Sequence, residues 1–122
     1  DLHLSLRRQR QMCIRDSIRL KSVALEICLT SNIQTGAVED IAYHPLKSFY
    51  HLGVLVTLNT DDPGISNTSL TDEYLLALQK VGLSPKELQA ILFNGVQAAF
   101  LPSGEKSRLD RECRERLKAL GM

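Results

Sequence analysis

The chain has 122 residues, of which 24% are charged, and a formal net charge of +1. This composition is ordinary for one globular domain or for part of a larger one. The near-neutral charge and the aromatic content of 5% argue against nucleic acid as a partner. No run approaches the roughly 20 apolar residues of a membrane-spanning helix, so we expect no membrane partner either.

The three cysteines, Cys13, Cys28 and Cys113, are odd in number and far apart. They form no Cys-x-x-Cys pair and no Cys/His ligand spacing, which argues against a structural zinc site. Unpaired thiols are typical of a reducing compartment, so we expect a cytoplasmic location.

Residues 1–17 differ from the rest of the chain because they are basic and polar without a clear apolar stripe. Residues 11–16 read Gln-Met-Cys-Ile-Arg-Asp, which resembles the translation of a transposon-end adapter used in preparing sequencing libraries. We therefore expect residues 1–17 to be a non-native leader and the native segment, residues 18–122, to begin near Ile18. A genuine solvated helix or tail is the alternative.

Two short apolar runs predict parallel strands joined by a helix. They are residues 23–29 and residues 54–58. Residues 31–40 between them are loop-like, and residues 44–52 read as a short helix that Gly53 ends. This order is a βαβ unit, which favours parallel pairing, and the nearly continuous apolar runs predict strands covered on both faces.

The C-terminal half predicts helices. After a loop over residues 64–69, we expect a helix over residues 70–81, and residues 84–87 (Ser-Pro-Lys-Glu) form a capping box that starts another. Residues 105–120 read as a charged surface helix. Helical spacing assigns the buried face of the middle helix to Leu88, Ile91, Leu92, Val96, Ala99 and Phe100.

The second candidate strand ends in two adjacent carboxylates, Asp61 and Asp62, followed by Pro63. Active sites of α/β enzymes open at the carboxyl ends of strands, where one carboxylate could bind a metal or act as a base and the other could contact a ligand. Asp-Asp-Pro-Gly is also good turn chemistry, so a plain turn is the structural alternative. Ser31 and Asn32 end the neighbouring strand and are expected on the same rim.

Several ordered motifs closely resemble the C-terminal part of adenosine deaminases. They are Leu-Glu-Ile-Cys-Leu-Thr-Ser-Asn-Ile-Gln-Thr-Gly (25–36), His-Pro-Leu (44–46) and Val-Thr-Leu-Asn-Thr-Asp-Asp-Pro (56–63), with further similarity at 71–74 and 94–102. The resemblance implies an α/β fold: the last two βα units and terminal helices of a TIM-type (β/α)8 metal-dependent hydrolase barrel.

The resemblance also implies hydrolytic deamination of adenosine or deoxyadenosine to inosine or deoxyinosine and ammonia by a zinc-activated water. Asp61 matches the family's zinc-ligating aspartate, which also hydrogen-bonds that water, so it is both the metal ligand and a catalytic residue. Asp62 matches the aspartate that contacts the purine ring nitrogens. Ser31, Asn32 and His44 resemble supporting positions on the rim. The expected partner is a small purine nucleoside, and the oligomeric state is left open.

The family's other zinc ligands and its catalytic glutamate have no counterpart in this sequence. We therefore expect this chain alone neither to hold Zn²⁺ tightly nor to deaminate. Adenine-type or other aminopurine deaminases are near alternatives. A non-catalytic module that binds a partner through an exposed helical face is an alternative of another class. In a third alternative, Asp61 is a nucleophile that accepts a phosphoryl group. The Asp-x-Asp spacing expected for that chemistry is absent from the sequence.

Overall fold

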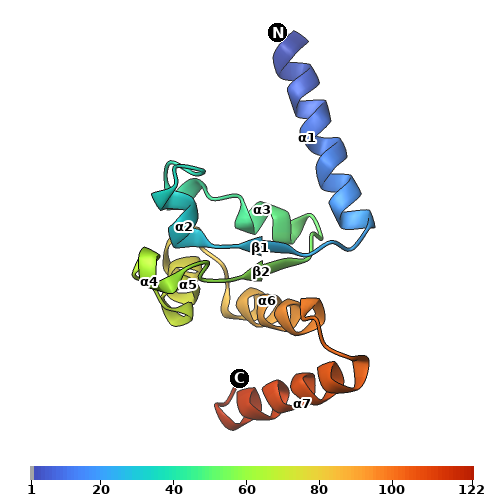
Figure 1. The fold of residues 1–122 in the computed structure, drawn as a ribbon, viewed down its shortest axis with the longest axis vertical. Helices are drawn as coiled ribbons and strands as arrows, with labels where there is room; N and C mark the ends of the chain where they lie inside the picture. Colours follow the sequence, from blue (N-terminus) through green and yellow to red (C-terminus); the bar gives the residue numbers. More distant parts are fainter. Residues whose placement is uncertain (1) are drawn as a thin grey trace.

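A two-stranded parallel sheet lies at the centre of the computed structural model, which describes residues 2–122, with side chains from residue 5 onward (Figure 1). Leu25 pairs with Val56, and Ile27 pairs with Leu58. The predicted parallel βαβ order is therefore confirmed. Its elements are β1 (Leu25–Ile27), α2 (Leu29–Gln34), the 3-10 helix η1 (Ile41–Tyr43), α3 (Leu46–His51) and β2 (Val56–Leu58).

Both strands are shorter than predicted, and two segments expected to be loops contain helices. The chain turns at Cys28, and Leu29, which is fully buried, begins α2. The second unexpected helix is α4 (Pro63–Ser66), where Asp62 is the N-cap and Pro63 occupies the first turn. Proline has a helix-compatible φ and needs no hydrogen-bond partner there, so the Asp-Pro pair starts a helix directly after the strand.

The C-terminal helices follow the predicted order. Helix α5 (Leu70–Leu76) runs into a π-helical turn, η2 (Ala77–Val81), and Gly82 then ends it with a φ of +83°. Helix α6 (Pro85–Ala98) begins with the predicted capping box of Ser84 and Glu87. Helix α7 (Ser103–Ala119) is the predicted charged surface helix.

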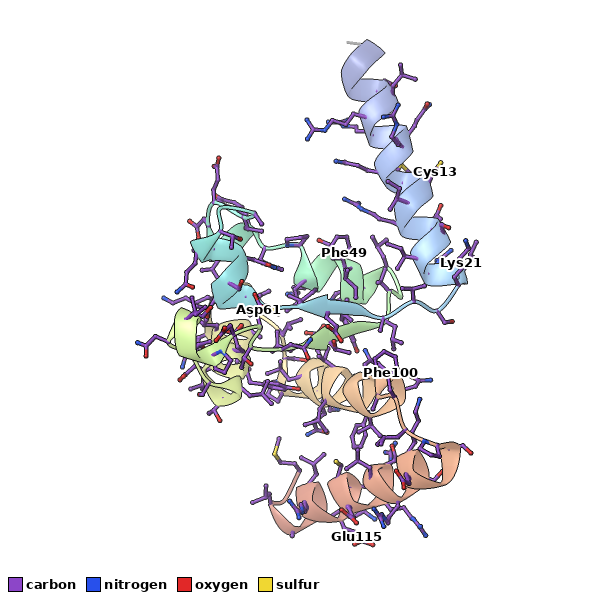
Figure 2. All side chains as sticks on the ribbon, viewed as in Figure 1. Cys13, Lys21, Phe49, Asp61, Phe100 and Glu115 are labelled. Carbon is purple, nitrogen blue, oxygen red and sulfur yellow. The ribbon has the colours of Figure 1, made fainter. Side chains whose placement is uncertain are left out.

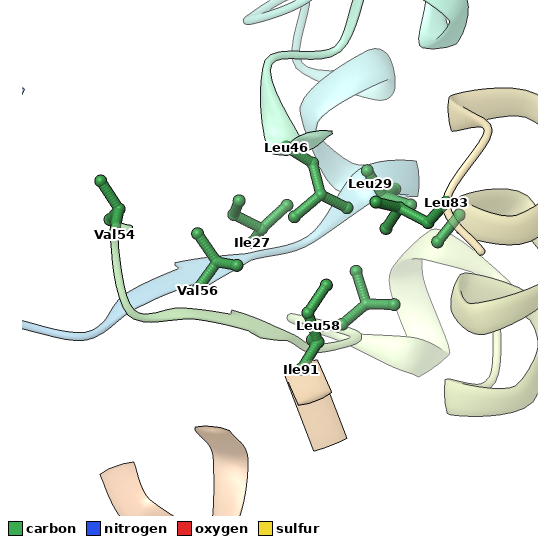
Figure 3. Close-up of a cluster of buried hydrophobic side chains, with 9 residues drawn as sticks. Ile27, Leu29, Leu46, Val54, Val56, Leu58, Leu83 and Ile91 are labelled. Carbon is green, nitrogen blue, oxygen red and sulfur yellow. The ribbon is translucent and has the colours of Figure 1, made fainter. Parts of the chain in front are cut away.

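The core is one cluster in which the two strands, α3 and α6 meet (Figure 3). Ile91 confirms the predicted buried face of α6, but the prediction for Phe100 is wrong, since that side chain is fully exposed. Helix α6 ends at Ala98, so Phe100 no longer follows helical spacing. The buried apolar residues are Ile27, Leu29, Leu46, Val54, Val56, Leu58, Ala77, Leu83 and Ile91.

The two strands differ in burial. All three residues of β2 are buried, whereas Glu26 of β1 is exposed. Successive side chains point to opposite faces, so Glu26 and its register partner Thr57 share the face opposite Ile27 and Leu58. The prediction of strands covered on both faces is therefore wrong for β1.

Helix α1 (Leu2–Leu20) extends away from the sheet (Figure 1), and its described side chains, from residue 5 onward, spread outward (Figure 2). Residues 5–17 are all exposed, while Ile18 packs against the core. The division of the chain at Ile18 stays a prediction; residue 1 and the side chains of residues 2–4 lie outside the described part. Within residues 2–122, no helix is long and apolar enough to cross a membrane.

Candidate active site

The carboxyl ends of β1 and β2 meet at one rim, where Asp61 lies (Figure 2). The Ser31 hydroxyl, from the first turn of α2, donates a hydrogen bond to Oδ2 of Asp61 over 2.8 Å. The two residues are 30 positions apart in sequence, and parallel pairing brings the ends of their strands together. The structure thus joins two of the residues singled out from the sequence.

Asp61 has a backbone φ of +62°, in the left-handed region. Aspartate tolerates this region better than most residues, but the conformation still costs free energy, and such strain concentrates at functional sites. Among the described residues, the hydrogen bonds of the Asp61 side chain involve Oδ2 alone, so Oδ1 is available to a metal ion or water.

Asp62 has a structural task of its own. Its Oδ1 accepts hydrogen bonds from the backbone N–H groups of Gly64 over 3.1 Å and of Ile65 over 3.2 Å. These bonds satisfy the free amides of the first turn of α4. The turn chemistry considered for the Asp-Asp-Pro-Gly motif is therefore real, and it fixes Asp62 at the start of a helix beside the rim.

His44 and Asn32 also lie together, with 2.9 Å between Nε2 of the imidazole and Nδ2 of the Asn32 side-chain amide. Nδ1 of His44 accepts a hydrogen bond from the N–H of Leu46 over 3.1 Å. Burial lowers the pKa of His44, so the ring is neutral at pH 7 and its one proton is on Nε2. That proton needs an acceptor, so the Asn32 amide has to turn its oxygen, in place of Nδ2, toward Nε2. Both ring nitrogens are engaged, so His44 supports α2 and is not free to bind a metal.

A buried glutamate beside this rim was missed in the sequence. Glu73 of α5 has no exposed surface. Its carboxylate accepts hydrogen bonds from the N–H of Thr30 over 3.2 Å, from the Thr30 hydroxyl, and from the Thr68 hydroxyl over 3.0 Å. The sequence did contain one signal for it. Glu73 lies four residues before Ala77, on the face of α5 that packs inward, where a charged residue is rare.

Cys28 lies at the same strand end, but it is not a nucleophile. Burial raises the pKa of its thiol, and the negative charges of Asp61, Glu73 and Glu26 raise it further. The thiol is therefore protonated at neutral pH, whereas the thiolate is the reactive form.

Among the side chains that the structure describes, residues 5–122, no group of three or more His, Cys, Asp or Glu could hold a metal ion. Zinc in proteins takes four ligands, and carboxylate oxygen is among those it accepts. Asp61, with Oδ1 available at the end of a buried strand, fits one such position.

A family model described as adenosine deaminase matches residues 7–116. The adenosine deaminase of Aliivibrio fischeri is 48% identical over 88 residues, which is 72% of this chain and 26% of that protein. The adenosine deaminase of Salmonella heidelberg is 43% identical over 96 residues, 79% of this chain and 29% of that protein. The chain thus spans less than a third of the length of these curated relatives.

Solved deaminase structures superpose on this chain. The adenine deaminase from Arthrobacter aurescens superposes with a TM-score of 0.81 at 26% identity, covering 86% of this chain and 32% of that one. The N6-methyl-AMP deaminase from Arabidopsis thaliana superposes with a TM-score of 0.70 at 35% identity, covering 76% and 28%. The predicted fold, an α/β part of a TIM-type barrel, is confirmed. By the match over residues 7–116 and the identity to these relatives, the chain belongs to the adenosine deaminase family.

Proposed function

We propose that the complete polypeptide carrying this chain is a zinc-dependent deaminase that converts adenosine or deoxyadenosine to inosine or deoxyinosine and ammonia. The observation that supports this most directly is the Asp61 carboxylate at the end of β2, held by Ser31 through one oxygen and available through the other. The three free thiols in the described chain are in keeping with a cytoplasmic enzyme.

Asp61 is proposed to have two tasks. A bound zinc ion would supply Lewis acidity that lowers the pKa of water toward about 7. Asp61 would bind the metal and accept a hydrogen bond from the attacking water, which aims that water at C6 of the purine. Since Ser31 restrains Oδ2, the carboxylate does not have to reorganise when the water attacks.

Asp62 is proposed to orient the base. Its Oδ1 is occupied by the amides of α4, so the carboxylate is fixed in direction before substrate arrives. The purine ring nitrogens would then meet a preset polar group, which holds C6 in line with the water. Ser31, Asn32 and His44 are proposed to support the rim without taking part in the chemistry.

Adenosine is preferred as the substrate because the curated relatives at 43–48% identity are adenosine deaminases. A bare aminopurine is the second candidate, since the Arthrobacter aurescens structure with a TM-score of 0.81 is an adenine deaminase. Two similar structures from Arabidopsis were solved as complexes with IMP and with GMP. Both of these ligands contain a purine, as both candidate substrates do.

The test joins residues 18–122 to the upstream part of the native gene and measures inosine formation in the presence of zinc. Asp61→Ala should lower kcat/KM by about 100-fold or more, because it removes both the metal ligand and the group that aims the water. Asp110→Ala, which removes a half-buried aspartate of α7 that pairs with Arg114, is the control and should leave the rate unchanged. Full turnover in Asp61→Ala would overturn the proposal, and parallel assays with adenine decide between the two substrates.

A further inference from the structure

Among the largest fully buried side chains of residues 5–122, Glu73 is the one that carries a charge, and the proposed chemistry does not use it. A buried carboxylate is costly unless it is paired or fully hydrogen-bonded. None of the salt bridges found in the described chain involves Glu73. Three donors stabilise it instead: one backbone N–H and two threonine hydroxyls.

These donors come from two separate segments of the rim. Thr30 lies in α2, one residue before Ser31, and is 43 positions from Glu73 in sequence. Thr68 lies between α4 and α5, and its N–H donates to the carbonyl of Pro63, directly after Asp62. Glu73 therefore bridges the segment that follows β1 to the segment that follows β2.

Ser31 is consequently restrained on both sides. Thr30 before it is held by Glu73, and Asn32 after it is held by His44. A third link joins the same segments, since the side-chain amide of Gln34 donates to the carbonyl of Ser66 over 3.1 Å. The hydroxyl of Ser31 thus reaches Asp61 from a turn whose neighbouring residues are both anchored.

We propose that Glu73 is a positioning residue of the active site, acting through Thr30 and Thr68 to keep the Ser31 hydroxyl on Oδ2 of Asp61. It touches neither substrate nor metal. The contribution to catalysis rests on the proposed function, whereas the bridge itself is a property of this chain. Outer groups that orient a metal ligand typically change metal affinity or activity by about 10–100-fold.

The first experiment uses the complete enzyme. Thr30→Val, which keeps the side-chain volume, and Glu73→Ala should each lower kcat and zinc retention by about 10–100-fold with little change in KM. In a Ser31→Ala background, Glu73→Ala should lower kcat by less than about twofold further, because both changes remove the same contact. Independent, multiplicative losses in this cycle would overturn the proposal, since they indicate general destabilisation.

Conservative variants separate bridging from charge. In Glu73→Gln, the amide oxygen can still accept from the Thr30 N–H, and the amide nitrogen can donate to the two hydroxyl oxygens. We expect its kcat to lie within about threefold of wild type, consistent with hydrogen bonds that are exchanged and not lost. In Glu73→Asp, the side chain is too short to reach both segments, so the kcat of this variant should resemble that of Glu73→Ala. A glutamine variant as impaired as the alanine variant would contradict a bridging role.

The second experiment needs neither metal nor activity. In the chain itself, hydrogen exchange of the Asn32 and Thr35 amides, which bond to Cys28 and Ser31, should accelerate at least about tenfold in Thr30→Val and Glu73→Ala. The matched control is Thr71→Val, which changes an exposed residue of α5, the helix that carries Glu73.

The outcomes of the two experiments are distinct. An inactive complete enzyme with accelerated exchange in the variants refutes the proposed function and leaves the bridge intact. An active enzyme whose Thr30→Val and Glu73→Ala variants keep wild-type kcat, zinc retention and exchange refutes the positioning role alone.

Discussion

At the scale of single residues, Asp61 and Asp62 show how neighbouring, identical side chains acquire different surroundings. Asp61 has a φ of +62°, whereas Asp62 is extended with a φ of −113°. The left-handed turn at the first aspartate directs its carboxylate to Ser31, and the second carboxylate meets the amides of α4. One backbone conformation therefore separates a candidate metal ligand from a helix cap.

His44 predicts a pH dependence of stability. Burial lowers its pKa in the folded chain below the ordinary value of 6.5, which the unfolded chain regains. Below pH 6.5 the unfolded chain binds more protons at this histidine than the folded chain does. The free energy of unfolding is therefore highest above that pH and falls as the pH drops toward the folded-state pKa. Urea unfolding at several pH values between about 7.5 and 5 should show a steeper decline for wild type than for His44→Gln. Equal slopes would contradict the prediction.

At the scale of elements, helix α6 connects local sequence signals to the position of β2. It packs Ile91 into the core, and the side-chain amide of Asn94 donates to the carbonyl of Val56 over 3.0 Å. Its start is set by Ser84, whose hydroxyl accepts from the N–H of Glu87, while Glu87 accepts from the N–H of Ser84 over 2.8 Å. The start of α6 thus helps to place the strand that carries Asp61.

Removing this cap should destabilise the chain. Ser84→Ala should lower the free energy of unfolding by about 1 kcal/mol, because one amide of the first turn loses its acceptor. Ser107→Ala, on the exposed surface of α7, is the matched control and should change it by less than about 0.5 kcal/mol. Both values follow from urea unfolding at pH 7. Equal losses in the two variants would show that the cap contributes nothing specific.

At the scale of the whole molecule, the rim would form one side of the proposed site. The sheet has two strands, and large apolar side chains such as Phe100, Ile65 and Leu20 are exposed (Figure 2 labels Phe100). The relatives are more than three times as long as the part this chain matches. The walls and the remaining zinc ligands of a deaminase site would therefore come from outside the described residues.

This incomplete ligand set predicts weak zinc binding. Calorimetric titration of the chain with zinc should show no 1:1 site in the nanomolar range. The reason is that Asp61 supplies one ligand, whereas zinc in proteins takes four. Asp61→Ala should leave the isotherm unchanged. A nanomolar 1:1 site that Asp61→Ala abolishes would mean that this chain assembles a metal centre by itself.

Features governed by neighbouring residues were predictable. The Ser84 cap, the end of the preceding helix at Gly82 and the last helix all depend on contacts within a few positions, so their residue types reveal them. The last helix was predicted over residues 105–120 and is observed over 103–119. The pairing of the two strands was also predictable, since a helix between two apolar runs favours a parallel arrangement. The expected rim followed from that pairing.

Features governed by distant contacts were not predictable. Helix α2 lacks a side-chain cap and is anchored by the burial of Leu29. Phe100 fits the apolar pattern of the sequence, but it lies past the end of α6, so its side chain does not join the buried face of that helix. Glu73 meets Thr30 across 43 positions, and no local pattern encodes that meeting.

The sequence by itself determined the family, the parallel βαβ unit and the two carboxylates at the end of its second strand, because ordered motifs and short-range preferences carry that information. Only the tertiary structure decided how these groups are used. It showed that Ser31 restrains Asp61, that Asp62 caps a helix, that both ring nitrogens of His44 are engaged, and that Glu73 bridges the two rim segments. These relations depend on burial and on contacts between distant residues, which only the folded chain brings together.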